Sequence, residues 1–429
     1  MWGWTVAITF GFTVLLPAQF RKNKVNCCGS PPNNRYLLII LGGTLILALW
    51  AILQTLPLHL LHSPISPLDH NTSTLTQSLL PRTISIVPDK SVGSLLVLMS
   101  HVLLFVGTYY CIQSRKDAQK LIAFMSVVAG LYGVYAFTNF FVSPDKVLWF
   151  DKLHDPKVLS GTFINRNNYA TYAGLGILVT VSWGASSLIR ERKQSTSHKW
   201  GLVRFYFTKG WITSLVGITL TSTLLLTGSR AGVLAVFLGL LTYALTLLGS
   251  VRTKTIKTIV TFMAIFMTIF AISGDALLER ISGIDWIGPR ATLYQTMLEA
   301  LKGRPIQGYG LGVFEDLLRV FRPPNLADYF DRGHGDFLEL FLTLGIPAAT
   351  LALAPFALLL FHFFRNRKKI SSEEDLSVAA SLPAAIVMVG AHALVDFPLQ
   401  IPAISYFFVA LLGVSFASFE ASINSEKSY

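Results

Sequence analysis

Long apolar blocks restrict the fold of this chain more than any other feature of its sequence. A helix needs about 20 apolar residues to cross the roughly 30 Å hydrocarbon core of a bilayer. Residues 36–56 meet this length without a single charged side chain. Eleven such blocks occur, at 2–20, 36–56, 92–112, 121–142, 169–189, 210–227, 231–249, 258–273, 336–364, 377–395 and 399–419. They predict an all-α, polytopic membrane protein with about eleven transmembrane helices.

Composition excludes a soluble protein. Of the 429 residues, 52% are hydrophobic and only 14% are charged, whereas soluble domains are about one quarter charged. The first block, residues 2–20, lacks a basic segment before it and a small-residue cleavage site. We therefore expect it to be a retained helix and not a signal peptide.

The distribution of Lys and Arg predicts the orientation. The segments 21–35, 113–120, 190–210, 250–257, 365–376 and the C-terminal tail together hold 21 of these residues, while the longer alternate segments hold 14. The positive-inside rule makes the first set cytoplasmic and puts the N-terminus outside. The net charge of +12 then reflects topology and anionic membrane lipids, and it gives no support to nucleic-acid binding.

Cofactor signals are absent from the sequence. The three cysteines, Cys27, Cys28 and Cys111, do not lie where oxidation would staple an outer loop, and no Cys/His cluster has zinc spacing. There is no Asp-x-Asp motif and no Walker loop. The glycines at 308, 310 and 312 follow no predicted strand, so we do not interpret them as a nucleotide turn. No metal or cofactor is expected, and any transfer reaction would need an already activated donor.

One outer segment, residues 274–336, is too long for a simple connection, and loops of this length tend to be functional. Leu293, Met297 and Leu301 recur every four residues and predict an amphipathic helix over 290–302. A second short helix is predicted over 313–321. We expect both helices to lie on the membrane surface as a cap over a cavity.

Five residues in the predicted outer regions could carry chemistry: Arg166, Arg230, Arg290, His334 and Asp336. Each arginine alone could equally be a charge that reaches the membrane interface. Arg230 is the hardest to explain in that way. It lies in a tight turn between two apolar blocks, where an unpaired charge costs roughly 2.5–3.5 kcal/mol on insertion scales.

These residue types suit a diphosphate leaving group. Arginine offers a fixed fork of donors that matches phosphate oxygens, and such groups stabilise the charge that develops as a glycosyl diphosphate departs. His334 could act as a base toward an acceptor hydroxyl or as a cationic donor to the diphosphate. A histidine near the start of a helix, with Asp336 beside it, would also be common as a purely structural residue.

Four short segments, 161–170, 226–232, 290–314 and 334–339, together resemble the O-antigen ligase/polymerase family of bacterial membrane proteins. A fifth, 392–402, looks like the boundary of that family's last-but-one helix. The resemblance covers roughly residues 160–415. It divides the chain into N-terminal helices (1–159), a ligase/polymerase-like membrane domain (160–419) that includes the outer loop 274–336, and a cytoplasmic tail (420–429).

The resemblance implies a C-type glycosyltransferase of the bacterial inner membrane. Such a protein takes a glycan from undecaprenyl diphosphate, without a metal, on the outer face. The family's diphosphate-binding arginines fall on Arg230, Arg166 and Arg290, and its histidine falls on His334. Two positions depart from the family: Gly335 stands where asparagine is usual, and Thr343 where an acidic residue is usual. The family also tends to have twelve helices, so the chain looks one helix short.

Other functions stay open at this point. A ligase and a polymerase differ in the acceptor, which can be a lipid core, a protein or another glycan. A cationic cavity could instead pass an anion such as bicarbonate, although the sequence has no internal repeat of the kind found in many transporters. A non-catalytic partner in glycan export is a third class. The long outer loop with clustered arginines and histidine favours an enzyme.

Overall fold

The structure is a computed structural model that describes residues 35–57, 83–152, 158–195, 197–248, 288–324, 326, 329–370 and 372–425. Two of the expected membrane helices, 2–20 and 258–273, lie outside these residues, as do residues 274–287 of the long loop. The described chain is almost wholly helical, and nine of its helical segments are long and apolar enough to cross a membrane. The predicted all-α, polytopic class is therefore confirmed.

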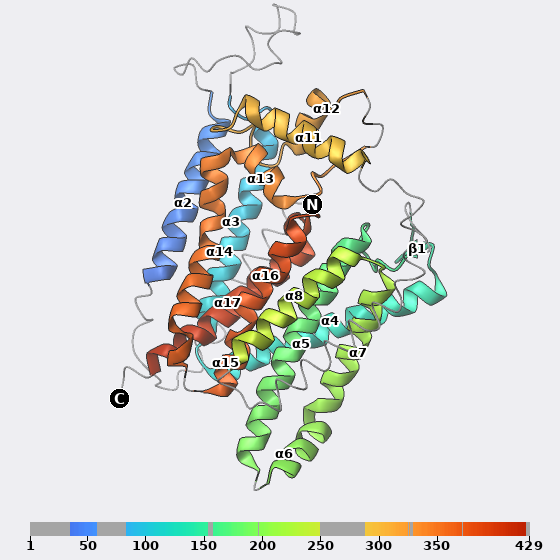
Figure 1. Cartoon of the computed structure of the whole chain (residues 1–429), viewed down its shortest axis with the longest axis vertical. Coiled ribbons are helices and arrows are strands. Elements are labelled where there is room, and N and C mark those ends of the chain that lie inside the picture. Colours follow the sequence, from blue (N-terminus) through green and yellow to red (C-terminus); the bar gives the residue numbers. More distant parts are fainter. Residues whose placement is uncertain are drawn as a thin grey trace, which may run out of the picture. The chain divides into compact units, whose positions relative to one another are not determined.

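The elements follow one another along the chain as shown in Figure 1. The first half comprises α2 (Arg35–Thr55), α3 (Pro88–Cys111), α4 (Arg115–Val142), the hairpin β1 (Lys146–Val147) and β2 (Phe150–Asp151), α5 (Arg166–Gln194), α6 (His198–Phe205), the π-helix η2 (Tyr206–Gly210), α7 (Trp211–Leu226) and α8 (Arg230–Leu247). The second half comprises α11 (Gly288–Gly303), α12 (Phe314–Phe321), α13 (Asp336–Leu344), α14 (Ile346–Asn366), η3 (Arg367–Lys369), α15 (Glu373–Ala379), α16 (Ser381–Ala393), η4 (Pro398–Gln400) and α17 (Pro402–Ser425).

The expected single span over 336–364 is wrong, because the structure divides it into α13 and α14. Gly345 separates the two helices with a φ of 80°, a conformation that L-residues with a side chain rarely adopt. A side-chain carbon at this position would lie 2.0 Å from the carbonyl oxygen of Ile306. The break therefore depends on glycine. By contrast, the two helices predicted in the long loop are present as α11 and α12.

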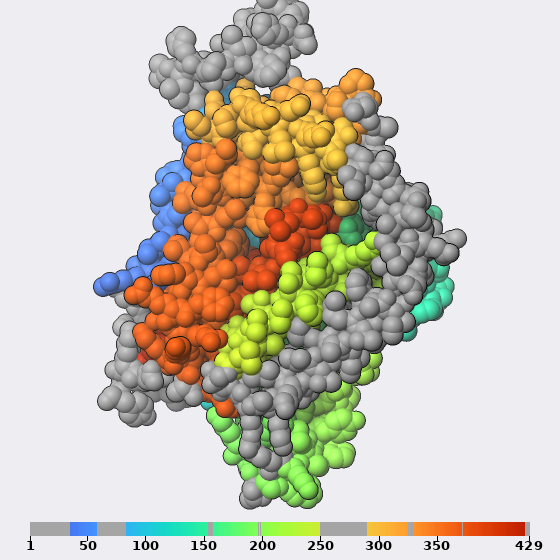
Figure 2. Space-filling model, in the orientation of Figure 1, coloured from blue at the N-terminus to red at the C-terminus, as the bar shows by residue number. Residues whose placement is uncertain are grey.

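Contacts divide the chain into two compact units. Among the described residues, the first unit contains 35–57, 83–102 and 288–358. Within it, α2 and α14 run side by side, and α11 and α12 lie across one end (Figure 1). Figure 2 shows residues 288–321, in yellow and light orange, as a continuous layer over that end. Leu293, Met297, Val313, Phe314 and Leu317 form the core of this layer.

Main-chain contacts hold the segment between α11 and α12 in place. Gly308, Gly310 and Gly312 all have positive φ values, of 66°, 110° and 76°. The amides of Tyr309 and Gly310 both donate to the carbonyl oxygen of Thr343, at 3.1 and 2.9 Å. The glycines at 308, 310 and 312 are thus explained by close packing of the backbone.

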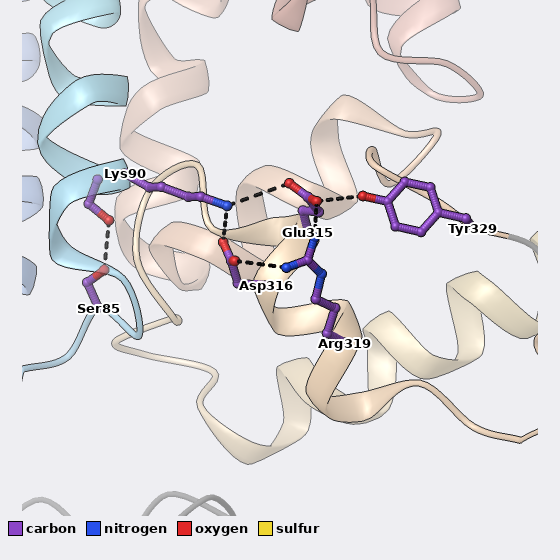
Figure 3. A network of polar contacts seen from close by, with 7 residues as sticks. Ser85, Lys90, Glu315, Asp316, Arg319 and Tyr329 are labelled. Atoms are coloured by element: carbon purple, nitrogen blue, oxygen red, sulfur yellow. Dashed lines mark hydrogen bonds and ion pairs between the residues drawn. The ribbon is translucent and has the colours of Figure 1, made fainter. Parts of the chain in front are cut away.

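A polar network fastens α12 to the first turn of α3 (Figure 3). The ammonium of Lys90 lies 2.6 Å from Asp316 and 3.6 Å from Glu315. Arg319 and the hydroxyl of Tyr329 each contact Glu315 at 2.5 Å. The hydrogen bond from Tyr329, aided by the cations of Lys90 and Arg319, lowers the pKa of Glu315 below its ordinary value.

The second unit contains the described residues of 103–248 and 359–425, with α5 at its centre. Helices α4, α7 and α8 pack against α5, and α16 packs along α8 (Figure 1). Glycines stand at the crossings: a side-chain carbon at Gly174 would lie 2.3 Å from Val236, and one at Gly239 would lie 2.7 Å from Met388. Small residues let helix backbones approach closely in membranes. This packing brings the N-terminal ends of α5 and α8 close to each other, and the C-terminal end of α16 close to the N-terminal end of α5.

Candidate functional site

The first unit brings Arg290 and His334 together. Arg290 lies in the first turn of α11, and His334 lies two residues before α13. The guanidinium Nη2 of Arg290 is 3.5 Å from Nδ1 of His334, the outer limit of a hydrogen bond. Because a guanidinium can only donate, Nδ1 is the acceptor in this contact. Both side chains are half-buried, so they remain accessible to a ligand.

The backbone of His334 is held in a left-handed conformation, with a φ of 48°. For a residue with a side chain this conformation costs about 1–3 kcal/mol and needs support from its surroundings. The hydroxyl of Tyr294, one turn after Arg290 on α11, donates to the carbonyl oxygen of His334 at 2.5 Å. The amide of the preceding residue, Gly333, donates to Oε2 of Glu339 at 2.7 Å. These two contacts hold the backbone of residues 333 and 334.

Asp336 is the first residue of α13 and is 7% exposed, while Glu339, in the same first turn, is 6% exposed. The helix dipole favours carboxylates at this end. Since two of them already occupy it, the N-terminus of α13 is poorly suited to a further anion.

The second unit contains the other two predicted arginines, and each is the first residue of a helix. Arg230 begins α8 after the three-residue turn Thr227-Gly228-Ser229. Ser229 caps the helix, since its Oγ accepts from the amide of Gly232 at 3.2 Å. The hydroxyl of Thr227 accepts from the amide of Ser229 at 3.1 Å. Gly228 closes the turn with a φ of 62°.

Arg166 begins α5, and the turn before Arg230 lies beside it. A side-chain carbon built at Gly228 would be 3.8 Å from Nη1 of Arg166. One built at Gly232 would be 2.6 Å from the side chain of Ala170. The first turns of α5 and α8 are therefore neighbours, and both begin with an arginine.

This placement is unfavourable for the helices alone. A cation at a helix N-terminus opposes the macrodipole, at a cost of typically 0.3–1 kcal/mol. Two adjacent N-termini with an arginine at each combine the positive ends of two helix dipoles with two guanidinium groups. The arrangement of Arg166 and Arg230 suits an anion with several oxygens, such as a phosphate or diphosphate.

Sequence reasoning missed the residues that hold these groups. Tyr294 was detectable in principle, because it lies four residues after Arg290 on the same helix face. Glu339 was not, since its contact to Gly333 depends on a loop conformation. Asn167 donates to Asp396 at 2.5 Å, across 229 residues of sequence, and no local pattern reveals such a pair.

Comparison with known proteins gives one family match. Residues 215–353 match the family described as O-antigen ligase. This region includes Arg230, Arg290, His334 and Asp336, and leaves Arg166 outside. No curated protein matches the chain. The match supports glycan transfer in polysaccharide biosynthesis by a multi-pass membrane protein. The resemblance read from the sequence is thus confirmed for residues 215–353, which match the O-antigen ligase family within a polytopic membrane protein.

Proposed function

We propose that the chain transfers a glycan from an undecaprenyl-diphosphate carrier to an acceptor on the outer face of the bacterial inner membrane, as an O-antigen ligase does. The acceptor is a lipid core, another glycan or a protein. The observation that carries this proposal is the pair of arginines, Arg166 and Arg230, that begin the neighbouring helices α5 and α8. The family match over residues 215–353 supports the same reaction class.

In this proposal Arg166 and Arg230 bind the diphosphate, and Arg290 keeps the diphosphate-binding role that the family resemblance implies for it. As the bond between the sugar C1 and the diphosphate oxygen breaks, negative charge grows on the leaving group. Charge-assisted hydrogen bonds contribute about 1.5–3 kcal/mol each, and they accelerate the reaction to the extent that they strengthen in the transition state. No cofactor is required, because the donor is already activated.

His334 acts on the acceptor. In the reaction, Nδ1 of His334 gives up its 3.5 Å contact with Arg290 and takes the proton of the acceptor hydroxyl, while the acceptor oxygen forms the new bond to C1. Asp336 helps to orient the imidazole ring of His334. The main-chain contacts from Tyr294 and Glu339 to residues 333 and 334 support a defined ring position, which a base needs.

The first test measures release of undecaprenyl diphosphate by the purified chain from an undecaprenyl-diphosphate-linked glycan in the presence of acceptor. Arg230→Lys keeps the charge and loses the fork, so we expect turnover to fall about 10- to 100-fold. Arg204→Lys is the control, since Arg204 pairs with Glu191 at 2.8 Å on the side of the chain predicted to be cytoplasmic. Full activity of Arg230→Lys would refute the diphosphate role.

The second test separates the two roles of His334 by pH. An imidazole ordinarily titrates near pH 6.5. A base must be uncharged, so activity should rise between pH 5.5 and about 7.5, whereas a cationic donor gives the opposite slope. His334→Ala and His334→Gln should remove the dependence together with most of the activity. An alanine variant as active as the parent protein at every pH would end the catalytic assignment.

An O-antigen or exopolysaccharide polymerase would use the same donor and the same leaving group, with another repeat unit as acceptor. Supplying a lipid core and a repeat-unit acceptor in parallel reactions distinguishes the two enzymes by which acceptor gains sugar. An anion transporter of the bicarbonate type would instead release no undecaprenyl diphosphate, and would move labelled bicarbonate into proteoliposomes.

A further inference from the structure

Two side-chain bridges join the first turns of α5 to the end of α16. Nδ2 of Asn167 donates to Oδ2 of Asp396 at 2.5 Å, and Oγ1 of Thr171 lies 2.6 Å from Nδ1 of His392. The two residues on each side are four positions apart, which is one helical turn. The bridges therefore form two successive rungs between antiparallel segments. We call these four residues the α5–α16 clamp.

Three of the four clamp residues are buried, and each oxygen of the Asp396 carboxylate accepts a hydrogen bond. Asp396 and His392 are each 1% exposed, and Thr171 is 2% exposed. The second carboxylate oxygen of Asp396, Oδ1, accepts from the amide of Phe397 at 2.8 Å. A buried carboxylate is costly unless it is hydrogen-bonded on both sides. With both oxygens bonded, Asp396 has a fixed orientation and so fixes Asn167.

Burying His392 at this position costs free energy, because one of its ring nitrogens has no hydrogen bond to a described residue. Its Nδ1 meets Thr171, but its Nε2 is buried and finds no hydrogen-bond partner among the described residues. Buried polar atoms without partners are rare in proteins. An apolar side chain would pack there at lower cost, so the value of the histidine lies in its rung to α5.

The clamp acts on the turn that carries Arg166. The side chain of Asn165 caps α5 by accepting from the amide of Asn167 at 2.8 Å. Arg166 lies between these two residues, and its guanidinium extends to the turn before Arg230. A rung that fixes Asn167 consequently fixes the direction in which Arg166 leaves the helix.

We propose that His392 and Asp396 are positioning residues that hold the first turn of α5 and thereby aim Arg166 at the donor diphosphate. This inference rests on the proposed function, and it adds residues that lie outside the matched family region. Neither His392 nor Asp396 touches the reacting atoms in this proposal. They act through Asn167 and Thr171.

A charge exchange tests the first rung. Asn167→Asp places a second carboxylate against the buried carboxylate of Asp396 and breaks the rung. Adding Asp396→Asn restores one amide facing one carboxylate, with the two partners exchanged. We expect Asn167→Asp to raise the KM for the undecaprenyl-diphosphate-linked glycan about tenfold, and the double variant to return it to within about threefold of the parent protein.

A hydroxyl deletion tests the second rung without any change in charge. Thr171→Val should raise the same KM about threefold to tenfold. Thr180→Val is the matched control: Thr180 is a buried threonine on the same helix that bonds to Ser126 at 2.8 Å, more than two turns farther from Arg166. Equal KM values for the two valine variants would overturn the positioning role of the second rung.

A spin label reports on the clamp without any donor. Ile164 is 83% exposed and lies two residues before Arg166, while Phe207 is 76% exposed and lies in η2. We expect Asn167→Asp to increase label mobility at position 164 only, and the double variant to reverse the increase. Unchanged mobility in Asn167→Asp, or a double variant that fails to recover, would overturn the clamp. The label at position 164 could respond as expected in a chain that neither binds nor cleaves the donor. That result would refute the proposed function, and with it the role of the clamp in donor binding.

Discussion

Tyr294 on α11 donates a hydrogen bond of 2.5 Å to the carbonyl oxygen of His334, which stands 40 residues later in the chain. This bond ties the helix that carries Arg290 to the loop that carries the histidine. The strained backbone of His334 persists because such contacts hold it.

Tyr294→Phe should lower turnover about tenfold with little effect on folding. The change removes one hydroxyl, so the carbonyl of His334 loses this donor and the ring moves from its working position, and small displacements of catalytic groups are costly. Release of undecaprenyl diphosphate and thermal unfolding would be measured side by side. Tyr329→Phe serves as the control, because Tyr329 is exposed and contacts Glu315. Parallel losses in both variants would contradict the assignment.

The loop glycines predict a stability difference. A side-chain carbon at Gly308 would lie 2.4 Å from the carbonyl oxygen of Thr343, and its φ is 66°. Gly308→Ala should therefore destabilise the protein by at least roughly 1–3 kcal/mol. Gly42→Ala, on α2 with nothing within 4 Å of the added carbon, should be neutral or slightly stabilising. Thermal unfolding in one detergent compares them, and equal melting temperatures would show that the loop shifts to accept the methyl group.

Acid should release α12 from α3. The pKa of Glu315 is lowered in the folded protein, first by the hydrogen bond from Tyr329 and then by Lys90 and Arg319. A lowered folded-state pKa means that the contribution of Glu315 to stability is present above its unfolded value, about 4.3, and disappears as pH falls through the folded value. Tyr329→Phe removes the largest cause, so loss of amide protection over 314–321 should begin at higher pH than in the parent protein. Hydrogen exchange measures this, and identical profiles would count against the network.

Topology can be tested at positions that the structure shows to be exposed. In a chain without native cysteines, Ile306→Cys should react in intact cells with an impermeant reagent, and Trp200→Cys should not. Ile306 and Trp200 are 65% and 62% exposed, so access to each depends on the side of the membrane. Reaction at 200 and not at 306 would invert the predicted orientation and remove the basis for an outer active site.

The sequence predicted where the helices lie, and it did not predict the break between α13 and α14. Within the described residues, apolar length predicted the nine helices that can span a membrane, and the four-residue recurrence of Leu293 and Met297 predicted α11. The break between α13 and α14 escaped because Gly345 lies inside a continuous apolar block. Its conformation follows from contact with Ile306, which hydropathy does not contain.

The candidate site shows the same division. Arg166, Arg230 and His334 were detectable as polar residues near the ends of apolar blocks, where charge is costly. Of the residues that hold the site in place, only Tyr294 was detectable in the same way. Glu339 and Asp396 bind partners that other segments bring to them, and Asp396 is separated from Asn167 by more than half of the chain.

The long-range bonds of α2 have a consequence for biosynthesis. Gln54 donates to the carbonyl oxygens of Gln307 and Thr343, at 2.7 and 3.1 Å, and its partners follow it by 253 and 289 residues. Ribosomes add about 5–20 residues per second, so α2 waits on the order of tens of seconds before these partners exist. During that interval a polar amide at the end of an apolar helix has none of these bonds. For most of translation, quality-control factors that survey nascent membrane proteins would therefore meet residues 34–102 of the first unit without residues 284–358.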